Sequence, residues 1–312
     1  MVIVFFGTPQ FAAPTLYRLL DSSHTVAGVV TQPDRPRGRG QKVSDAPVKA
    51  LAASRQVPIL QPERLKPPQV ADALRAWAPD LGVVAAYGRI IPEHLLSVPR
   101  LGMINVHASL LPKYRGAAPV HRAVIDGESE TGVSIMRLVP ELDAGPVFAE
   151  VRRAIGPDET SDVVEEALAH LGADLLLDVV EQMAEGTAHE VLQDDSRATY
   201  APRLTKDEGL IDWSQPATTI HNRIRGLYPW PHAYTFLNGA RLIVRRSRRE
   251  AGTSNATPGT IIRLTREAIH VATGANGEVT LLEIQPEGRR PMNVRDFLAG
   301  HQVAEGSVFS AS

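Results

Sequence analysis

Asn105 and His107 place two polar side chains two residues apart in an otherwise apolar run, Ile104-Asn105-Val106-His107. The run is typical of a buried β-strand, in which side chains at alternate positions project from the same face. Polar groups that point together from a buried strand need hydrogen-bonding partners, which either a ligand or the protein's own core supplies. The pair is therefore a candidate site, with a satisfied core Asn and His as the alternative.

A carboxylate follows a second apolar run that is typical of a strand. Asp143 lies in Leu142-Asp143-Ala144-Gly145-Pro146, directly after another apolar run that is typical of a strand. It joins the candidate site if this turn meets the end of the strand that carries His107. The alternative is a turn aspartate, a position in which Asp is common.

Short apolar runs alternate with helical periodicity through the first half of the chain. Strands are predicted at 2–6, 25–31, 81–86, 103–106 and 133–138, and helices at 10–20, 46–53, 69–76, 118–125 and 160–181. This alternation predicts an α/β fold, a Rossmann-like, doubly wound, mostly parallel sheet. Open sheets of this kind bind ligands at the carboxyl ends of their strands, where Asn105 and His107 are expected.

The residue composition of the chain changes after residue 192. A polar, proline-containing segment at 193–207 is predicted to be a linker, and short strands separated by Asn-Gly and Pro-Gly turns follow at 241–244, 259–264, 268–272 and 279–284. These strands predict a small, OB-like β-barrel. The expected organisation is a catalytic domain at 1–192, the linker at 193–207 and the barrel domain at 208–312.

Composition excludes several classes of protein. The 312 residues are 43% hydrophobic, enough for two globular domains, and the net charge of −2 excludes a globally basic nucleic-acid coat. The absence of cysteine removes disulfides, thiolate zinc sites and iron–sulfur clusters, and the ten histidines form no HExxH pair, so no metal is expected. No GxGxxG or phosphate-loop motif occurs, which disfavours a nicotinamide dehydrogenase.

The N-terminal run at 1–6 leads directly into Gly7-Thr8-Pro9, which is turn chemistry. It therefore predicts a strand and not a signal peptide. No apolar run approaches the length needed to span a membrane. A cytoplasmic monomer is expected.

Charge is distributed unevenly between the two predicted domains. Residues 208–312 hold 12 arginines and no lysine against nine acidic residues, a net charge of +3, whereas the rest of the chain carries −5. Regular alternation along a strand would place Arg241, Arg245 and Arg249 on one face. Such a face either is simply solvated or contacts phosphate groups.

Several motifs in order along the chain resemble the folate-dependent formyltransferases. The two central ones are Asn105-x-His107 followed by Ser109-Leu110-Leu111-Pro112, and Leu142-Asp143-x-Gly145. The segments that resemble the branch acting on methionyl-tRNA are 6–12, 31–41, 84–92, 113–122, 201–209 and 226–231. The resemblance covers essentially the whole chain, although Glu141 stands where the family usually has glycine.

The resemblance implies formyl transfer from 10-formyltetrahydrofolate to the α-amino group of methionine on initiator tRNA. In that reaction the Asn105 amide and protonated His107 would stabilise the oxyanion of a tetrahedral intermediate. Asp143 would orient His107 and stabilise its charged form, and it or a bound water would accept the amine proton. Glu141 either faces solvent or increases the proton affinity of Asp143.

The resemblance also implies the binding residues. Folate would be bound by Ser109, Leu110, Leu111, Pro112, Tyr87, Gly88 and Ile90, and tRNA by Arg35, Arg37, Arg39, Lys42, Arg241, Arg245 and Arg249. Phe11 would pack near the methionyl side chain, its alternative role being that of a core residue in the first helix. Likewise, Leu110 and Leu111 have a core role as the alternative.

Two alternatives stay open beside this hypothesis. A related formyltransferase with another amine acceptor would share Asn105, His107 and Asp143, but it would not explain the arginine-rich loop together with the basic second domain. A non-enzymatic RNA-binding protein on a Rossmann-like scaffold would not need the three polar residues at this spacing.

Overall fold

The computed structural model describes residues 1–34, 45–250 and 252–311. It divides into two compact units, each described by itself below. The first unit comprises 1–119, 131–153 and 165–201, and the second comprises 120–130, 154–164 and 202–312. Two short segments that precede residue 192 in the chain are therefore part of the second unit.

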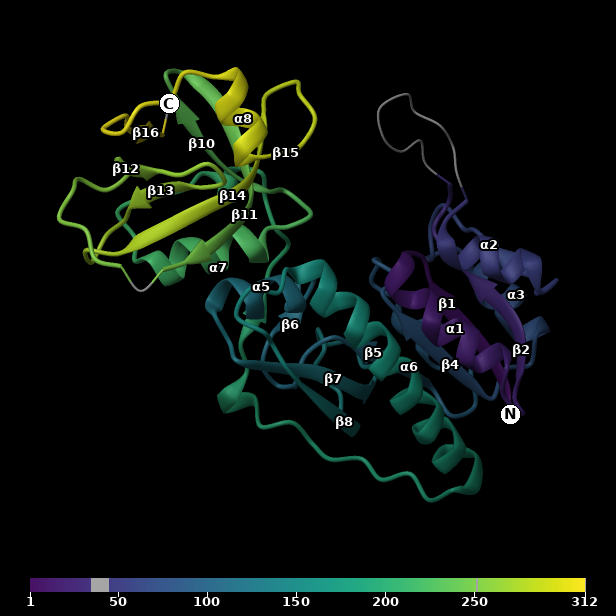
Figure 1. Cartoon of the computed structure of the whole chain (residues 1–312). Coiled ribbons are helices and arrows are strands. Elements are labelled where there is room, and N and C mark those ends of the chain that lie inside the picture. The colour runs from purple at the N-terminus through teal and green to yellow at the C-terminus, as the bar shows by residue number, and fades with distance from the viewer. Residues whose placement is uncertain (35–44, 251, 312) are drawn as a thin grey trace. The chain divides into compact units, whose positions relative to one another are not determined.

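The first unit is built on a mixed sheet with the strand order β3-β2-β1-β4-β5-β7-β8 (Figure 1). The first five strands in this order are parallel, and β7 runs antiparallel to β5. The strands are β1 (Val2–Gly7), β2 (Thr25–Val30), β3 (Ile59–Leu60), β4 (Leu81–Ala85), β5 (Met103–His107), β7 (Glu130–Arg137) and β8 (Val147–Ala154). The Rossmann-like, mostly parallel sheet predicted from the sequence is confirmed.

Helices lie between the strands of this sheet, and one more, α6 (Ser161–Glu185), follows its last strand, β8. The others are α1 (Ala13–Leu20), which follows the short helix η1 (Gln10–Ala12), α2 (Pro47–Ser54), α3 (Pro68–Ala76) and α4 (Glu93–Leu96). From β1 the chain moves outward in one direction to β2 and β3, and then in the other to β4 and β5. The strand order therefore reverses between β1 and β4, which is where doubly wound sheets bind ligands.

Continuous apolar runs form the interior strands because both of their faces are covered. Val4, Phe6 and Val84 pack in one buried cluster with α3 residues such as Leu74. On another part of the sheet, Gly172 of α6 lies against Val106 and Val133, where even a Cβ atom would come within about 3 Å of both side chains. Figure 1 shows α6 running alongside β5 and β7. Val106 therefore faces α6, and its neighbours Asn105 and His107 project from the opposite face of β5.

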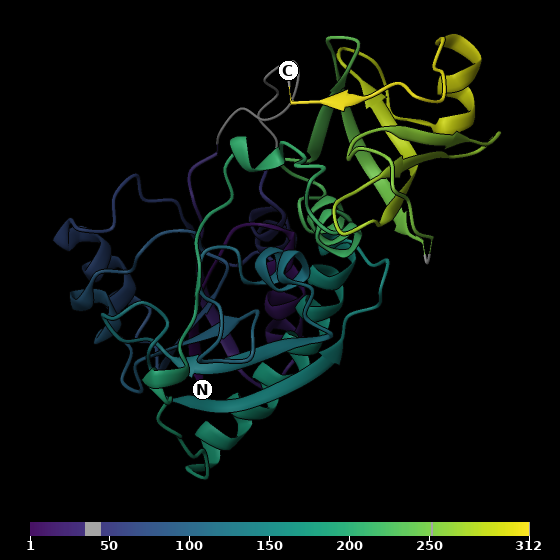
Figure 2. The same cartoon turned by 90° about the vertical axis from the view of Figure 1, so that its left-hand side faces the viewer.

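The segment after α6 is ordered where the sequence predicts a linker. It returns along the first unit, bridges Val147 through Val191, and forms η2 (Asp195–Arg197) and β9 (Tyr200–Ala201) (Figure 2). β9 pairs in parallel with β6 (Arg115–Gly116). Residues 191–201 therefore contribute backbone pairing to the first unit.

The second unit contains a curled, mostly antiparallel sheet with the order β12-β13-β14-β11-β10-β16. Its strands are β10 (Ala233–Leu237), β11 (Ala240–Arg249), β12 (Ile261–Leu264), β13 (Ile269–Ala272), β14 (Glu278–Pro286), β15 (Met292–Asn293) and β16 (Phe309–Ser310). Its helices are α5 (Pro119–Asp126), η3 (Asp207–Gly209), α7 (Ala217–Gly226) and α8 (Val294–Gly300). The sequence patterns did not predict β10, α7 or α8.

Backbone hydrogen bonds join the two edges of this sheet. Ile261 N donates to Ser307 O at 2.8 Å, and Phe309 N donates to Gly259 O at 2.9 Å. Inside the curl, Trp213 stacks on Phe309 and its indole N–H donates to Thr235 Oγ1 at 3.0 Å. The predicted small β-barrel is confirmed.

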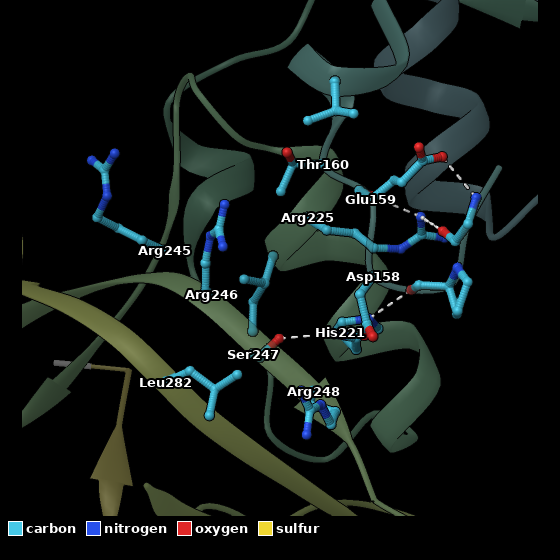
Figure 3. A pocket seen from close by; sticks show the side chains of 14 residues that line it. Asp158, Glu159, Thr160, His221, Arg225, Arg245, Arg246, Ser247, Arg248 and Leu282 are labelled. Carbon is cyan, nitrogen blue, oxygen red and sulfur yellow. Dashed lines mark hydrogen bonds and ion pairs between the residues drawn. The ribbon is translucent and has the colours of Figure 1, made fainter. Parts of the chain in front are cut away.

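His221 of α7 fastens the 154–164 segment to the barrel (Figure 3). Its Nε2 lies 2.9 Å from Pro157 O, and its Nδ1 lies 2.9 Å from Ser247 Oγ of β11. A carbonyl only accepts hydrogen bonds, so Nε2 carries a hydrogen, and Nδ1 shares its hydrogen bond with the Ser247 hydroxyl. Burial is the main cause that lowers the pKa of His221 from its ordinary value of 6.5.

No helix among the described residues is both long enough and apolar enough to cross a membrane. This includes α6, which has 25 residues but carries acidic side chains along its length.

The lowered pKa of His221 predicts a contribution to the pH dependence of stability. As the pH falls below 6.5 the unfolded chain binds a proton at His221 before the folded chain does, so the free energy of unfolding decreases. In His221→Gln this decrease should be smaller, by up to about 1.4 kcal/mol per pH unit. Denaturant titrations of both proteins between neutral and mildly acidic pH measure the difference. His94→Gln, at an exposed histidine, is the control. Identical pH slopes for His221→Gln and wild type would contradict the assignment.

Candidate functional site

His107 and Asp143 meet in the first unit. Asp143 Oδ2 lies 3.7 Å from His107 Nδ1, and both side chains are largely buried. This pairing was not dictated by the topology, because β7 is antiparallel to β5 and its last residue, Arg137, lies beside Ile104. The loop after β7 must therefore come back toward the carboxyl end of β5.

His107 is oriented from the side opposite Asp143. Its Nε2 lies 3.0 Å from the backbone oxygen of Tyr114, a carbonyl that can only accept, so Nε2 carries a hydrogen. Nδ1 is therefore the ring nitrogen left for a second partner, and it faces Asp143. A separation of 3.7 Å is too long for a hydrogen bond, so Nδ1 keeps its hydrogen-bonding capacity for another group.

Asp143 is held in a left-handed backbone conformation, with φ of 47°. Its Oδ2 accepts a hydrogen bond from Gly116 N at 2.8 Å, and Gln193 Nε2 donates to its backbone oxygen at 2.8 Å. The turn also requires Gly145, because a Cβ atom there would lie 1.9 Å from Arg137 O. The surroundings thus fix both the backbone and the carboxylate of Asp143.

Asn105 is partly buried and lies two residues before His107 on the same face of β5. Its backbone pairs with β4 and β7, opposite Val84 and Met136. Among the described residues, no hydrogen bond is formed by its side-chain amide. The amide is therefore available to a bound molecule. Glu141 is exposed, which agrees with the alternative in which its side chain faces solvent.

The two predicted folate segments follow adjacent parallel strands, β4 and β5, and so lie at the same edge of the sheet. Gly88 is exposed and the Ile90 side chain is 86% exposed, whereas the Tyr87 side chain is 2% exposed and packs edge-on against Phe6. Tyr87 presents its backbone instead, and its oxygen accepts a hydrogen bond from Gln32 Nε2 at 2.7 Å.

In the segment after β5, Leu110 and Pro112 are partly exposed, whereas Ser109 and Leu111 are buried. The Ser109 hydroxyl donates to Lys113 O at 2.6 Å, and Leu111 N donates to Ser134 Oγ at 3.1 Å. Ser109 and Leu111 therefore have structural partners within the protein.

Phe11 lies in η1, directly after β1, and its side chain is 7% exposed. It is near the point where the strand order reverses, yet it is packed as a core residue. Of the predicted tRNA-binding residues, Arg35, Arg37, Arg39 and Lys42 lie outside the described residues.

The prediction that Arg241, Arg245 and Arg249 share one face was wrong. The register of β11 shifts between Val244 and Ser247, and the buried positions change there from Leu242 and Val244 to Ser247. Alternation therefore no longer relates Arg249 to the two earlier arginines.

Arg241 and Arg245 are also occupied by neighbours in the barrel. The Arg241 guanidinium lies 3.9 Å from the ring centre of Tyr234. Arg245 Nε donates to Glu283 at 3.0 Å, and its Nη2 donates to Tyr228 at 3.1 Å. Arg249 is exposed, and its Nη1 donates to Thr218 Oγ1 of α7 at 3.2 Å.

A cavity of about 450 Å³ in the second unit is lined by Arg245, which the sequence predicts to bind tRNA, and by three arginines outside that prediction, Arg225, Arg246 and Arg248. Arg225 of α7 extends toward the 156–160 segment and donates to Gly156 O and Glu159 O (Figure 3). Arg246 and Arg248 of β11 line the same cavity and are exposed. Asp158 and Glu159 add negative charge, so the cavity is basic but not uniformly so.

Among the described residues, no group of three or more His, Asp or Glu side chains is placed to hold a metal ion.

The chain matches two family models. One is described as formyl transferase and matches residues 1–180, and the other is described as formyl transferase, C-terminal domain, and matches residues 203–302.

Among solved structures, the chain resembles the sugar 3N-formyl transferase WlaRD, in the presence of dTDP and 5-N-formyl-THF, with a TM-score of 0.69. It resembles an N-formyltransferase from Helicobacter canadensis with a TM-score of 0.67. Each is 15% identical to this chain; the alignments cover 93% and 92% of this chain and 99% and 100% of the other, respectively. These likenesses support the fold.

Two methionyl-tRNA formyltransferases are much more similar to this chain in sequence than these solved structures are. The methionyl-tRNA formyltransferase of Trichlorobacter lovleyi is 47% identical over 98% of this chain and 96% of its own length. That of Caldanaerobacter subterraneus subsp. tengcongensis is 46% identical over 99% of both chains. The chain therefore belongs to the methionyl-tRNA formyltransferases of the formyl transferase family.

Proposed function

We propose that this chain transfers the formyl group of 10-formyltetrahydrofolate to the α-amino group of methionyl initiator tRNA, using Asn105, His107 and Asp143. Its similarity to methionyl-tRNA formyltransferases over nearly its full length supports the reaction. The observation that carries the residue assignment is the approach of Asp143 to His107 at 3.7 Å beside the uncommitted amide of Asn105.

In the proposed mechanism the neutral amine attacks the formyl carbon and gives a tetrahedral intermediate. Donors placed where the oxygen becomes negative lower the barrier, and the Asn105 amide and the Nδ1–H of protonated His107 are the two that the site offers. The carboxylate of Asp143 stabilises the charged imidazole. The proton of the amine passes to Asp143 or to a bound water. A proton is returned to the folate nitrogen as its bond to the formyl carbon breaks, which leaves tetrahydrofolate and the formylated amine.

For the formyl donor, we propose a binding site between the ends of β4 and β5. Ile90 and Leu110 would cover the apolar faces of the pterin, and the exposed backbone at Gly88 would pair with its polar edge. Ser109, Leu111, Pro112 and Tyr87 would shape this wall from within the protein. Folate is here a co-substrate, and the proposal involves no metal.

For tRNA, the proposal combines both basic parts of the chain. Arg35, Arg37, Arg39 and Lys42 would contact the acceptor end, and Phe11 would pack near the methionyl side chain. In the second unit the exposed guanidinium groups of Arg246, Arg248 and Arg249 are the best placed to bind phosphates. Arg241 and Arg245 contribute charge while holding their own neighbours. The protein would act as a cytoplasmic monomer.

The catalytic assignment predicts the effect of single substitutions. Asn105→Ala, His107→Ala and Asp143→Ala should each lower kcat by at least about 10²- to 10³-fold, because each removes a group that acts in the transition state. Formation of formylmethionyl-tRNA from 10-formyltetrahydrofolate measures kcat, with charged elongator tRNA as the control acceptor. Binding of the donor should survive in all three variants. Near-wild-type turnover in one of them would remove that residue from the site.

The phosphate assignment predicts a change in salt dependence. The logarithm of the affinity for methionyl-tRNA should fall with the logarithm of the salt concentration, and Arg246→Ala with Arg248→Ala should flatten that slope by about 1 for each phosphate that the variant no longer binds. Equilibrium binding over a range of salt concentrations gives the slope. Arg64→Ala, at an exposed arginine of the first unit, is the control. An unchanged slope in the double variant would place the phosphate-binding residues elsewhere.

A further inference from the structure

We infer that Gln193 is a positioning residue that holds Asp143 in its working geometry. The inference rests on the proposed function, because it concerns how Asp143 reaches His107. Gln193 lies in the segment that the sequence predicts to be a linker, 50 residues beyond Asp143. Its hydrogen bonds go to the turn that carries Asp143 and to Arg115, whose chain neighbours Tyr114 and Gly116 bond His107 and Asp143.

The side-chain amide of Gln193 donates hydrogen bonds to two backbone oxygens of the turn that carries Asp143. Nε2 donates to Asp143 O at 2.8 Å and to Gly145 O at 2.7 Å. An amide nitrogen has two N–H groups, and here each has one carbonyl as its partner. These two bonds fix the backbone on both sides of Ala144.

The amide oxygen of Gln193 is fixed by a buried cation. Oε1 accepts from Arg115 Nε at 3.1 Å and from Arg115 Nη2 at 2.8 Å. Arg115 is only 5% exposed and is itself anchored by Asp195 at 2.6 Å. Rotating the amide by half a turn would set its oxygen against two carbonyls and its nitrogen against a guanidinium, so only one orientation is possible.

Arg115 also lies next to the residue that holds the carboxylate of Asp143. Arg115 begins β6, and the N–H of its neighbour Gly116 donates to Asp143 Oδ2 at 2.8 Å. Gly116 has φ of 125°, and a Cβ atom there would lie 2.8 Å from Ala201 O of β9. The backbone of Asp143 is therefore held by Gln193 and its carboxylate by Gly116, and Arg115 links the two.

This arrangement explains how a non-glycine residue keeps φ of 47° at the site. A left-handed conformation is unfavourable for residues other than glycine unless the surroundings fix it. Without the two bonds from Gln193, the turn is free to relax and Asp143 Oδ2 moves relative to His107 Nδ1. A displacement of about 1 Å in a catalytic group can cost about 10²-fold in rate.

The experiment compares Gln193→Met and Gln193→Glu with wild type in formylation of methionyl-tRNA. Methionine removes all four hydrogen bonds at similar size, whereas glutamate keeps an acceptor for Arg115 and removes only the two donors to the turn. Both variants should lose about 10- to 100-fold in kcat, with KM for both substrates changed by only a few-fold. Gln69→Met, at an exposed glutamine of the first unit, is the matched control and should leave both constants unchanged.

A double-mutant cycle separates positioning from a general loss of structure. If Gln193 acts through Asp143, then Gln193→Met should have little further effect on kcat in the Asp143→Ala background. The pH profile of kcat should also shift in Gln193→Met, because the distance between His107 and Asp143 changes. Additive losses, or wild-type kcat in Gln193→Glu, would overturn the inference. An inactive wild type would instead contradict the proposed function.

Discussion

The site depends on the loop after β7, which brings Asp143 back to His107. β7 runs antiparallel to β5, so the strand that leads to Asp143 ends beside the beginning of β5 and not beside its end. The loop compensates by packing its backbone tightly at Gly145 against Arg137 O. Everything proposed for the reaction requires that this loop stay in place when substrates bind and leave.

Two buried arginines hold together segments that are far apart in the sequence. A buried charge is unfavourable unless hydrogen bonds and counter-charges satisfy it. In the first unit Arg115 joins β6 to Gln193 and Asp195, and in the second unit Arg225 joins α7 to Gly156 O and Glu159 O. Burial is the main cause that lowers the pKa of Arg225 from its ordinary value. Both arginines connect parts of the chain that are more than 60 residues apart.

The two units offer different surfaces to a reaction between a small folate and a large polyanion. The sheet edge of the first unit presents an amide, an imidazole and exposed apolar and backbone groups at Ile90 and Gly88. The second unit presents exposed arginines on β11. A chain with a net charge of −2 can therefore still attract nucleic acid, because its positive charge is collected locally.

Local patterns were enough to predict the sheet, the face shared by Asn105 and His107, and the barrel, because strand periodicity and turn residues act over a few neighbours. Several other features could not be predicted in this way. They include the direction of β7, the bulge that separates Arg249 from Arg241, the burial of the Tyr87 side chain, and the bonds from Gln193 to the Asp143 turn. Each of these depends on contacts or backbone irregularities that arise only when distant segments pack together. The sequence by itself thus determined which side chains are available for the chemistry, and the tertiary structure decided which of them meet.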